Sequence, residues 1–70
     1  MDRMTDLTSR EYQIAGLVAE GLTNKEIGGR IGLREQTVKN HLRAAMQKTG
    51  SHGRARLAAM YALNELRRPA

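Results

Sequence analysis

The chain has 70 residues, with 12 lysines and arginines, 7 aspartates and glutamates, a formal net charge of +5 and no cysteine. This length provides one small domain, and the lack of cysteine excludes disulfides and thiolate metal sites. No apolar run approaches the roughly 18–20 residues that span a membrane, and the cysteine-free composition fits the reducing cytoplasm, where we expect the protein to act.

The first helix is predicted over about residues 9–20. Thr8 and Glu11 have the spacing of a capping box, in which each side chain accepts a hydrogen bond from the backbone amide of the other residue. Apolar residues then recur at helical spacing, and Gly21 supplies a stop. Residues 1–6 contain no apolar stretch and are predicted to form a tail.

A second helix is predicted over about residues 24–31, where the same signals repeat. Thr23 begins another capping box, and Gly32 ends the helical pattern. Gly28 and Gly29 lie inside this helix, where each costs about 1 kcal/mol relative to alanine. We expect both glycines to allow close approach of the backbone to a neighbouring helix.

The third predicted helix covers about residues 35–48 and follows Gly32 after only Leu33 and Arg34. Two helices joined by a three- or four-residue turn that contains glycine form a helix-turn-helix. One face of the third helix is apolar, and its opposite face carries polar residues at spacings of three and four. These polar residues are Gln36, Lys39, Asn40, Arg43 and Gln47.

The polar face of the third helix has the residue types that read DNA. In the major groove, lysine and arginine suit guanine, asparagine and glutamine suit adenine, and an acidic residue would repel the phosphates. The predicted base-reading residues are Gln36, Lys39, Asn40 and Arg43. The same residue types occur on ordinary solvent-facing helices, but the preceding short helix and tight turn favour DNA.

Contacts to the DNA backbone are predicted around this face. Between Gln36 and Asn64 the chain has no acidic residue, so this part presents a basic surface of one sign. Hydroxyls, ammonium groups and helix N-terminal amides bind phosphates. The predicted phosphate contacts are Thr23, Lys25, Thr37 and Lys48. Thr23 also has a structural role as a helix cap.

A fourth helix is predicted over about residues 54–67, and it stops before Pro69. Its apolar residues lie nearly all round the helix, which is more than one face of a small domain can bury. We expect another chain or another domain to cover part of this surface.

Four motifs in order resemble the LuxR-type, or GerE-type, helix-turn-helix domain. They are LTSRE at residues 7–11, GLTNKEI at 21–27, TVKNHL at 37–42, and Lys48 with Arg54. The resemblance covers about residues 5–66 without gaps, and the domain that it implies spans residues 7–67. It implies an all-α fold of four helices, in the winged-helix-like superfamily but without a wing.

The resemblance implies a sequence-specific transcriptional regulator that binds double-stranded DNA as a homodimer on an inverted repeat. The base-contacting positions of the family match the same four residues of the third helix. The fourth helix would supply the dimer contact, here from Ala59, Leu63 and Leu66. RNA polymerase is a further candidate partner. The resemblance also implies that Glu11 and Arg54 are structural residues, paired so that they tie the first helix to the fourth.

Several positions depart from the family pattern. Arg34 replaces the serine that usually caps the third helix, and Gly28 replaces a usual alanine. Thr49 and Ser51 replace apolar residues, and Gly53 replaces a small polar cap on the fourth helix. A lost cap costs about 1 kcal/mol, and together we expect these changes to weaken the packing of the fourth helix.

Other classes of binding protein are less well supported. A helical protein that keeps this fold but binds or masks a partner regulator is the main alternative, because the fourth helix is so apolar. Binding of structured RNA is disfavoured, since Tyr12 and Tyr61 are the only aromatic residues and provide no stacking platform.

An enzyme is the class that the sequence favours least. It has no cysteine, no carboxylate pair beside a histidine, and no glycine-rich phosphate loop after a strand. His41 and His52 alone make a poor zinc site, so we predict no catalytic residue, no metal and no cofactor. Members of the family usually join this module to a regulatory domain, so the chain is either a stand-alone regulator or part of a longer one.

Overall fold

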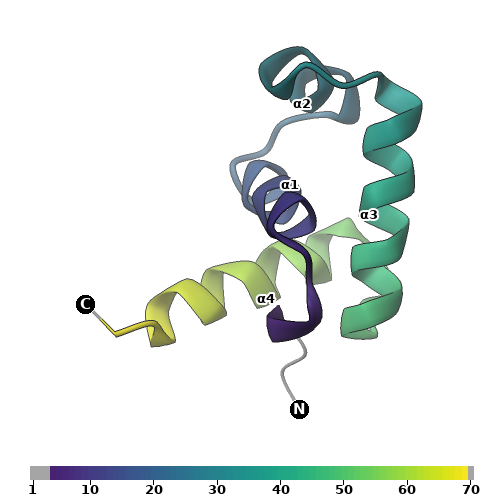
Figure 1. Cartoon of the computed structure of the whole chain (residues 1–70). Helices are drawn as coiled ribbons and strands as arrows, with labels where there is room; N and C mark the ends of the chain where they lie inside the picture. The colour runs from purple at the N-terminus through teal and green to yellow at the C-terminus, as the bar shows by residue number, and fades with distance from the viewer. Residues whose placement is uncertain (1–3, 70) are drawn as a thin grey trace.

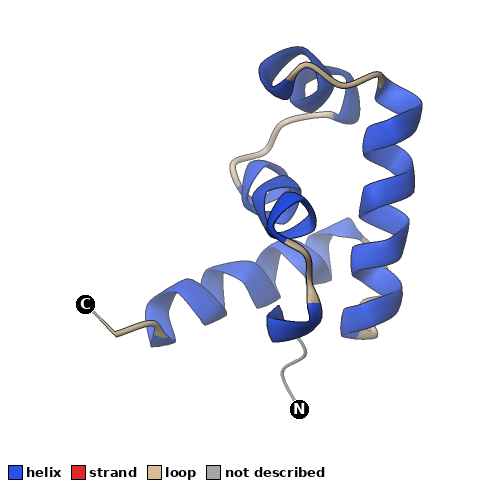
Figure 2. Cartoon of the chain, viewed as in Figure 1, coloured by secondary structure: helices blue, strands red, loops and turns tan. Residues whose placement is uncertain are grey.

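The computed structural model describes residues 4–69 as a short 3₁₀ helix followed by four α-helices (Figure 1). The elements are η1 (Met4–Asp6), α1 (Ser9–Ala19), α2 (Asn24–Ile31), α3 (Glu35–Thr49) and α4 (Arg54–Arg67). Figure 2 shows helices and loops, and no strand, in this part of the chain. The all-α prediction is confirmed, and each helix lies within one residue of its predicted range.

The helix α1 lies at the centre of the molecule (Figure 1). It packs against both α3 and α4, while α2 packs mainly against α3, beside the end at which that helix begins. This arrangement leaves α3 along one edge of the molecule (Figure 1). The outer side of α3 is therefore positioned to meet a partner.

The segment before α1 contributes to the core. Residues 4–6, which were predicted to belong to a tail, form η1, and Met4 is only 3% exposed. The 3₁₀ helix packs against α3 and α4. A single methionine carries no periodic signal, which is why sequence pattern did not predict its burial. Residues 1–3 of the predicted tail lie outside the described residues.

Both predicted capping boxes are present. Thr8 Oγ1 accepts a hydrogen bond from the Glu11 amide at 3.1 Å, and the Thr8 amide donates to Glu11 Oε1 at 3.0 Å. In the second box, the Glu26 amide donates to Thr23 Oγ1 at 3.1 Å, and the Thr23 amide donates to Glu26 Oε1 at 2.8 Å. As predicted, α3 and α4 begin without a side-chain cap.

Each α-helix contributes one large, fully buried aliphatic side chain to a single core. These side chains are Ile14, Ile27, Val38 and Leu57. Burial of a side chain of this size stabilises a fold by about 1.5–3 kcal/mol. The core therefore joins all four α-helices, and it fixes the orientation of α3.

The two glycines inside α2 differ in their surroundings. A Cβ atom at Gly28 would lie 2.4 Å from the carbonyl oxygen of Leu33, so a larger residue requires the turn to shift. At Gly29, no described atom beyond its own helical neighbourhood lies within 4 Å of such a Cβ. Close approach is therefore confirmed for Gly28, although its neighbour is the turn and not a helix. For Gly29 the expectation is wrong.

A further close approach, at Gly16, was not predicted. A Cβ atom there would lie 2.9 Å from the ring of Tyr61 on α4. The Tyr61 ring also packs against Tyr12 of α1, with ring centroids 4.8 Å apart. The missing side chain at Gly16 thus lets α4 lie close to α1.

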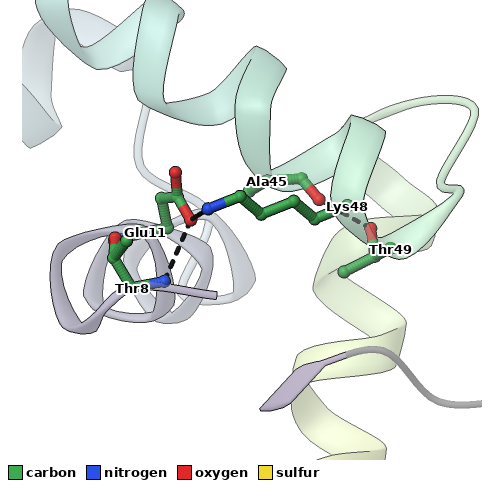
Figure 3. A network of polar contacts seen from close by, with 5 residues as sticks. All are labelled: Thr8, Glu11, Ala45, Lys48 and Thr49. Atoms are coloured by element: carbon green, nitrogen blue, oxygen red, sulfur yellow. Dashed lines mark hydrogen bonds and ion pairs between the residues drawn. The ribbon is translucent and has the colours of Figure 1, made fainter. Parts of the chain in front are cut away.

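The predicted pair between Glu11 and Arg54 is wrong. Glu11 Oε1 instead binds Lys48 Nζ of α3 at 2.7 Å (Figure 3). Arg54 donates to Asn24 Oδ1 and to the Leu22 carbonyl, both at 2.8 Å. The reason is that Glu11 at the start of α1 lies beside the end of α3, whereas the Arg54 side chain reaches the segment where α2 begins. The Glu11–Lys48 pair and the bonds of Arg54 therefore replace the single pair that was predicted.

Thr49 and Ser51 form part of a buried polar contact and do not leave a defect. Thr49 Oγ1 donates to the Ala45 carbonyl at 2.9 Å (Figure 3) and lies 2.8 Å from Ser51 Oγ. Ser51 Oγ also lies 3.2 Å from Met60 Sδ on α4, in a hydrogen-bonding arrangement. No buried side-chain nitrogen or oxygen lacks a partner in the described part of the chain. The expected weakening of α4 is thus not supported at these two positions.

The outer face of α4 is exposed along its second half. Leu63 is 48% exposed and Leu66 is 83% exposed, whereas Leu57 near the start of the helix is fully buried. The domain thus buries one side of α4 and leaves apolar surface on the other. Within residues 4–69, no helix has the length and hydropathy needed to cross a membrane.

Candidate nucleic-acid interface

A tight turn and a shared core hold α2 and α3 together. Gly32 ends α2 with a φ of +75°, in the left-handed region that favours glycine. The Leu33 amide then donates to the Gly28 carbonyl at 2.9 Å. Ile27 of α2 and Val38 of α3 are both completely buried. The two helices and their turn therefore form the helix-turn-helix that the spacing predicted.

The structure brings the four predicted base-reading residues together on the outer side of α3. They are Gln36, Lys39, Asn40 and Arg43, and all are exposed. The buried positions of α3 lie on the opposite side of the helix. Gln36 Nε2 donates to Asn40 Oδ1 at 3.1 Å, while Lys39 and Arg43 make no hydrogen bond or ion pair with any described residue. The face thus offers two bonded amides and two cations without a protein partner.

The predicted phosphate contacts differ in how their polar groups are engaged. Lys25 is exposed, and Thr37 is half-buried in the first turn of α3. The Thr23 hydroxyl accepts the amide that completes its capping box, so its structural role is confirmed. Lys48 binds Glu11. The ammonium group of Lys48 is therefore held against α1, and that of Lys25 faces solvent.

Figure 3 shows how the Lys48 side chain extends from α3 to the start of α1. Glu11 is 6% exposed, and its Oε1 also accepts the Thr8 amide at 3.0 Å. Burial by itself raises the pKa of Glu11, but the hydrogen bond and charge of Lys48 and the hydrogen bonds of Thr8 outweigh it. The net pKa of Glu11 therefore lies below its ordinary value. A charged carboxylate therefore holds the end of α3 against α1.

Two exposed arginines beside the turn were not predicted as DNA contacts. Arg30 lies in the last turn of α2, and Arg34 immediately precedes α3. Arg34 has no hydrogen bond or ion pair with the residues that the structure describes. The sequence signal for Arg34 is a basic residue directly before the helix with the predicted base-reading face, a position from which side chains can bind phosphates.

The rest of the described surface offers no comparable site. A shallow hollow of about 510 Å³ lies between η1, the start of α1 and the end of α4, and its lining includes Tyr12, Asn64 and Arg68. Residues 4–69 contain no cluster of three or more histidine, cysteine, aspartate or glutamate side chains that could hold a metal ion. The outer face of α3 is therefore the candidate functional site.

Comparison with known proteins agrees with this geometry. The sequence profile of the family described as "Bacterial regulatory proteins, luxR family" matches residues 5–61. This range includes η1, apart from its first residue, all of α1, α2 and α3, and the first half of α4. The chain belongs to the LuxR family of bacterial regulatory proteins. The resemblance inferred from the four sequence motifs is thereby confirmed.

One relative within the LuxR family is the "DNA-binding transcriptional activator DevR/DosR" of Mycobacterium tuberculosis (strain ATCC 25618 / H37Rv). It is 43% identical to this chain over 67 residues, which are 96% of this chain and 30% of the relative. The chain thus spans less than a third of the length of that relative. No solved structure gave a significant match. The LuxR family consists of DNA-binding transcription regulators and is not a class of enzymes.

Proposed function

We propose that this LuxR-family protein is a sequence-specific transcriptional regulator whose helix α3 enters the major groove of double-stranded DNA. The supporting observation is the outer face of α3, where the four base-reading residues are exposed and no acidic residue follows Glu35. The major groove is wide enough to admit one α-helix. A tight turn and a buried core hold this helix rigidly, so its side chains reach the bases in a fixed register.

The residues of this face have separate roles in the proposed complex. Lys39 and Arg43 donate to the O6 and N7 acceptors of guanine, which is the commonest base-specific contact of these residue types. Gln36 and Asn40 supply the amides that suit adenine. The flanking phosphates are bound by the predicted contacts whose groups can face the DNA backbone, namely Thr23, Lys25 and Thr37. We assign Lys48 to the ion pair with Glu11 and not to a phosphate.

We also propose that two copies bind an inverted repeat through α4. Ala59, Leu63 and Leu66 are exposed and lie at spacings of four and three, so they share one side of α4. Burial of these side chains between two copies would remove apolar surface from water. The relative is named as an activator, which makes RNA polymerase a candidate partner here, and a regulator of this kind acts in the cytoplasm.

Selection of bound duplexes from a random DNA pool, at near-physiological salt and followed by sequencing, tests the proposal. We expect an enriched inverted repeat whose half-sites lie about one helical turn apart. A Lys39→Ala/Arg43→Ala double variant is the matched control, because both side chains are exposed and have no described partner, so its helical circular dichroism should be unchanged. A single enriched half-site would retain the base-reading role and exclude the dimer.

A helical protein that masks another regulator is the second candidate. The exposed leucines of α4 favour it, because an apolar surface of this kind suits a protein partner as well as a second copy. This reading predicts no enriched DNA sequence and only weak binding that disappears as the salt concentration rises. The same selection experiment therefore separates the two functions.

A further inference from the structure

A hydrogen bond joins two of the four residues on the outer face of α3. Gln36 Nε2 donates to Asn40 Oδ1 at 3.1 Å, between exposed side chains one helical turn apart. Among the described residues, neither side chain has another hydrogen-bond partner. The two amides thus contact each other at the position where, under the proposed function, each would contact a base.

The bond restricts how the Asn40 amide can meet a base. A free asparagine reads adenine with two atoms, since its carbonyl oxygen accepts from N6 while its amino group donates to N7. In this structure Oδ1 of Asn40 already accepts from Gln36, so one of its two lone pairs is engaged and the bond favours one orientation of the Asn40 amide. One lone pair of Oδ1 and both amino protons of Asn40 are left for DNA, together with the carbonyl oxygen and one amino proton of Gln36.

Entry into a DNA groove should strengthen the coupling between the Gln36 and Asn40 amides. In free protein the bond is weak, because water competes for both amides. In a DNA groove from which water is excluded, an amide group without a partner is costly. In the groove, the polar atoms of both amides can then all be hydrogen-bonded only in a limited set of arrangements with the bases.

We propose that Gln36 and Asn40 act as one recognition unit, in which Gln36 orients the amide of Asn40 and so helps to determine the base that Asn40 prefers. The inference rests on the proposed function and makes Gln36 a positioning residue as well as a contact. A change at residue 36 should then alter the preference at the base pair beneath residue 40.

A double-mutant cycle on DNA discrimination tests this proposal. The proteins are wild type, Gln36→Met, Asn40→Ala and the double variant, each measured on the selected sequence and on all single-base-pair variants of one half-site. Methionine keeps the length of glutamine and removes its amide. We expect Gln36→Met to reduce discrimination at the same base pair as Asn40→Ala, and the double variant to lose at least threefold less than the product of the two single losses.

The chain offers a matched control pair. Lys39 and Arg43 have the same spacing on the same face, and they make no bond to each other. The losses of discrimination caused by Lys39→Ala and by Arg43→Ala should multiply in the double variant, and they should fall on different base pairs. A Gln36→Lys variant, which keeps a donor for Asn40 Oδ1, should retain the wild-type preference at the base pair that Asn40 reads.

The outcomes distinguish this inference from the proposed function. If the losses of discrimination from Gln36→Met and Asn40→Ala multiply and fall on different base pairs, the recognition unit is overturned. An enriched DNA sequence would in that case still support the proposed function. A random pool from which no sequence is enriched would overturn both.

Discussion

Lys48 Nζ lies 2.7 Å from Glu11 Oε1, and the same oxygen accepts the backbone amide of Thr8 at 3.0 Å (Figure 3). One carboxylate therefore completes the cap of α1 and also holds the end of α3. The Glu11 side chain is 7% exposed and that of Lys48 is 36% exposed, so the pair is only partly screened by solvent. The ion pair therefore adds to the buried core in holding α3 against α1.

Replacement of Lys48 by methionine should destabilise the domain. Lys48→Met leaves the buried Glu11 carboxylate without its cation, and we expect the free energy of unfolding to fall by about 1–3 kcal/mol. Urea unfolding followed by circular dichroism measures this loss. Lys25→Met is the control, because Lys25 is exposed and its replacement should change stability by less than about 0.5 kcal/mol. Equal losses in the two variants would contradict the structural role of Lys48.

Acid should remove the contribution of the same ion pair. Because the folded protein holds the pKa of Glu11 below its ordinary value, the pair stabilises the domain above that ordinary value, and the effect is lost as the pH falls through the lowered pKa. The difference in unfolding free energy between wild type and Lys48→Met should therefore narrow between about pH 7 and about pH 3.

The comparison of two proteins is needed because Glu26 and Glu65 also have lowered pKa values, from hydrogen bonds of Thr23 and of Tyr12 respectively. Their effects are common to wild type and variant and cancel in the difference. If the difference in unfolding free energy between wild type and Lys48→Met stays constant with pH, Lys48 stabilises the protein by packing alone.

The glycines of α2 should respond differently to alanine. At Gly29 the space is open, so Gly29→Ala should stabilise the domain by up to about 1 kcal/mol through helix propensity. At Gly28 the new methyl group would lie 2.4 Å from the Leu33 carbonyl oxygen, so the turn must move and the gain should be reduced or reversed. Thermal unfolding of both variants measures the difference. A Gly28→Ala protein as stable as Gly29→Ala would show that the turn shifts without cost.

Substitutions on the DNA face should separate base contacts from phosphate contacts. Lys39→Ala should cost about 1–3 kcal/mol on the selected sequence and relax the preference at one base pair. Lys25→Ala should weaken binding to all sequences about equally. It should also make the slope of log affinity against log salt concentration shallower by about one. Fluorescence titration over a series of salt concentrations measures both. A uniform loss from Lys39→Ala would remove Lys39 from the base-reading set.

Charge on the exposed side of α4 should prevent dimer formation. Leu63 is 48% exposed, so Leu63→Glu should leave the monomer folded and reduce the amount of two-subunit complex on an inverted repeat. Gel mobility on one-half-site and two-half-site duplexes gives the result, with circular dichroism as the check on folding. If the helical signal disappears, Leu63 belongs to the core and not to an interface.

Local features of this protein were determined by the sequence by itself. The starts of α1 and α2 followed from capping boxes at Thr8 and Thr23, and the ends of α2 and α3 from Gly32 and Gly50, because these signals act within one helical turn. The shared outer face of Gln36, Lys39, Asn40 and Arg43 followed from helical periodicity, since all four residues belong to one rigid element. Motif order was enough to identify the family.

Contacts between distant segments were decided only by the tertiary structure. Glu11 pairs with Lys48, 37 residues away, and Arg54 bonds to Asn24, 30 residues away. The predicted pair between Glu11 and Arg54 does not form. The burial of Met4 and the place of Tyr61 over Gly16 were likewise not predicted. Such contacts depend on the angles and offsets at which helices cross, and these are set by the packing of the whole core and not by the spacing of residues along any one helix.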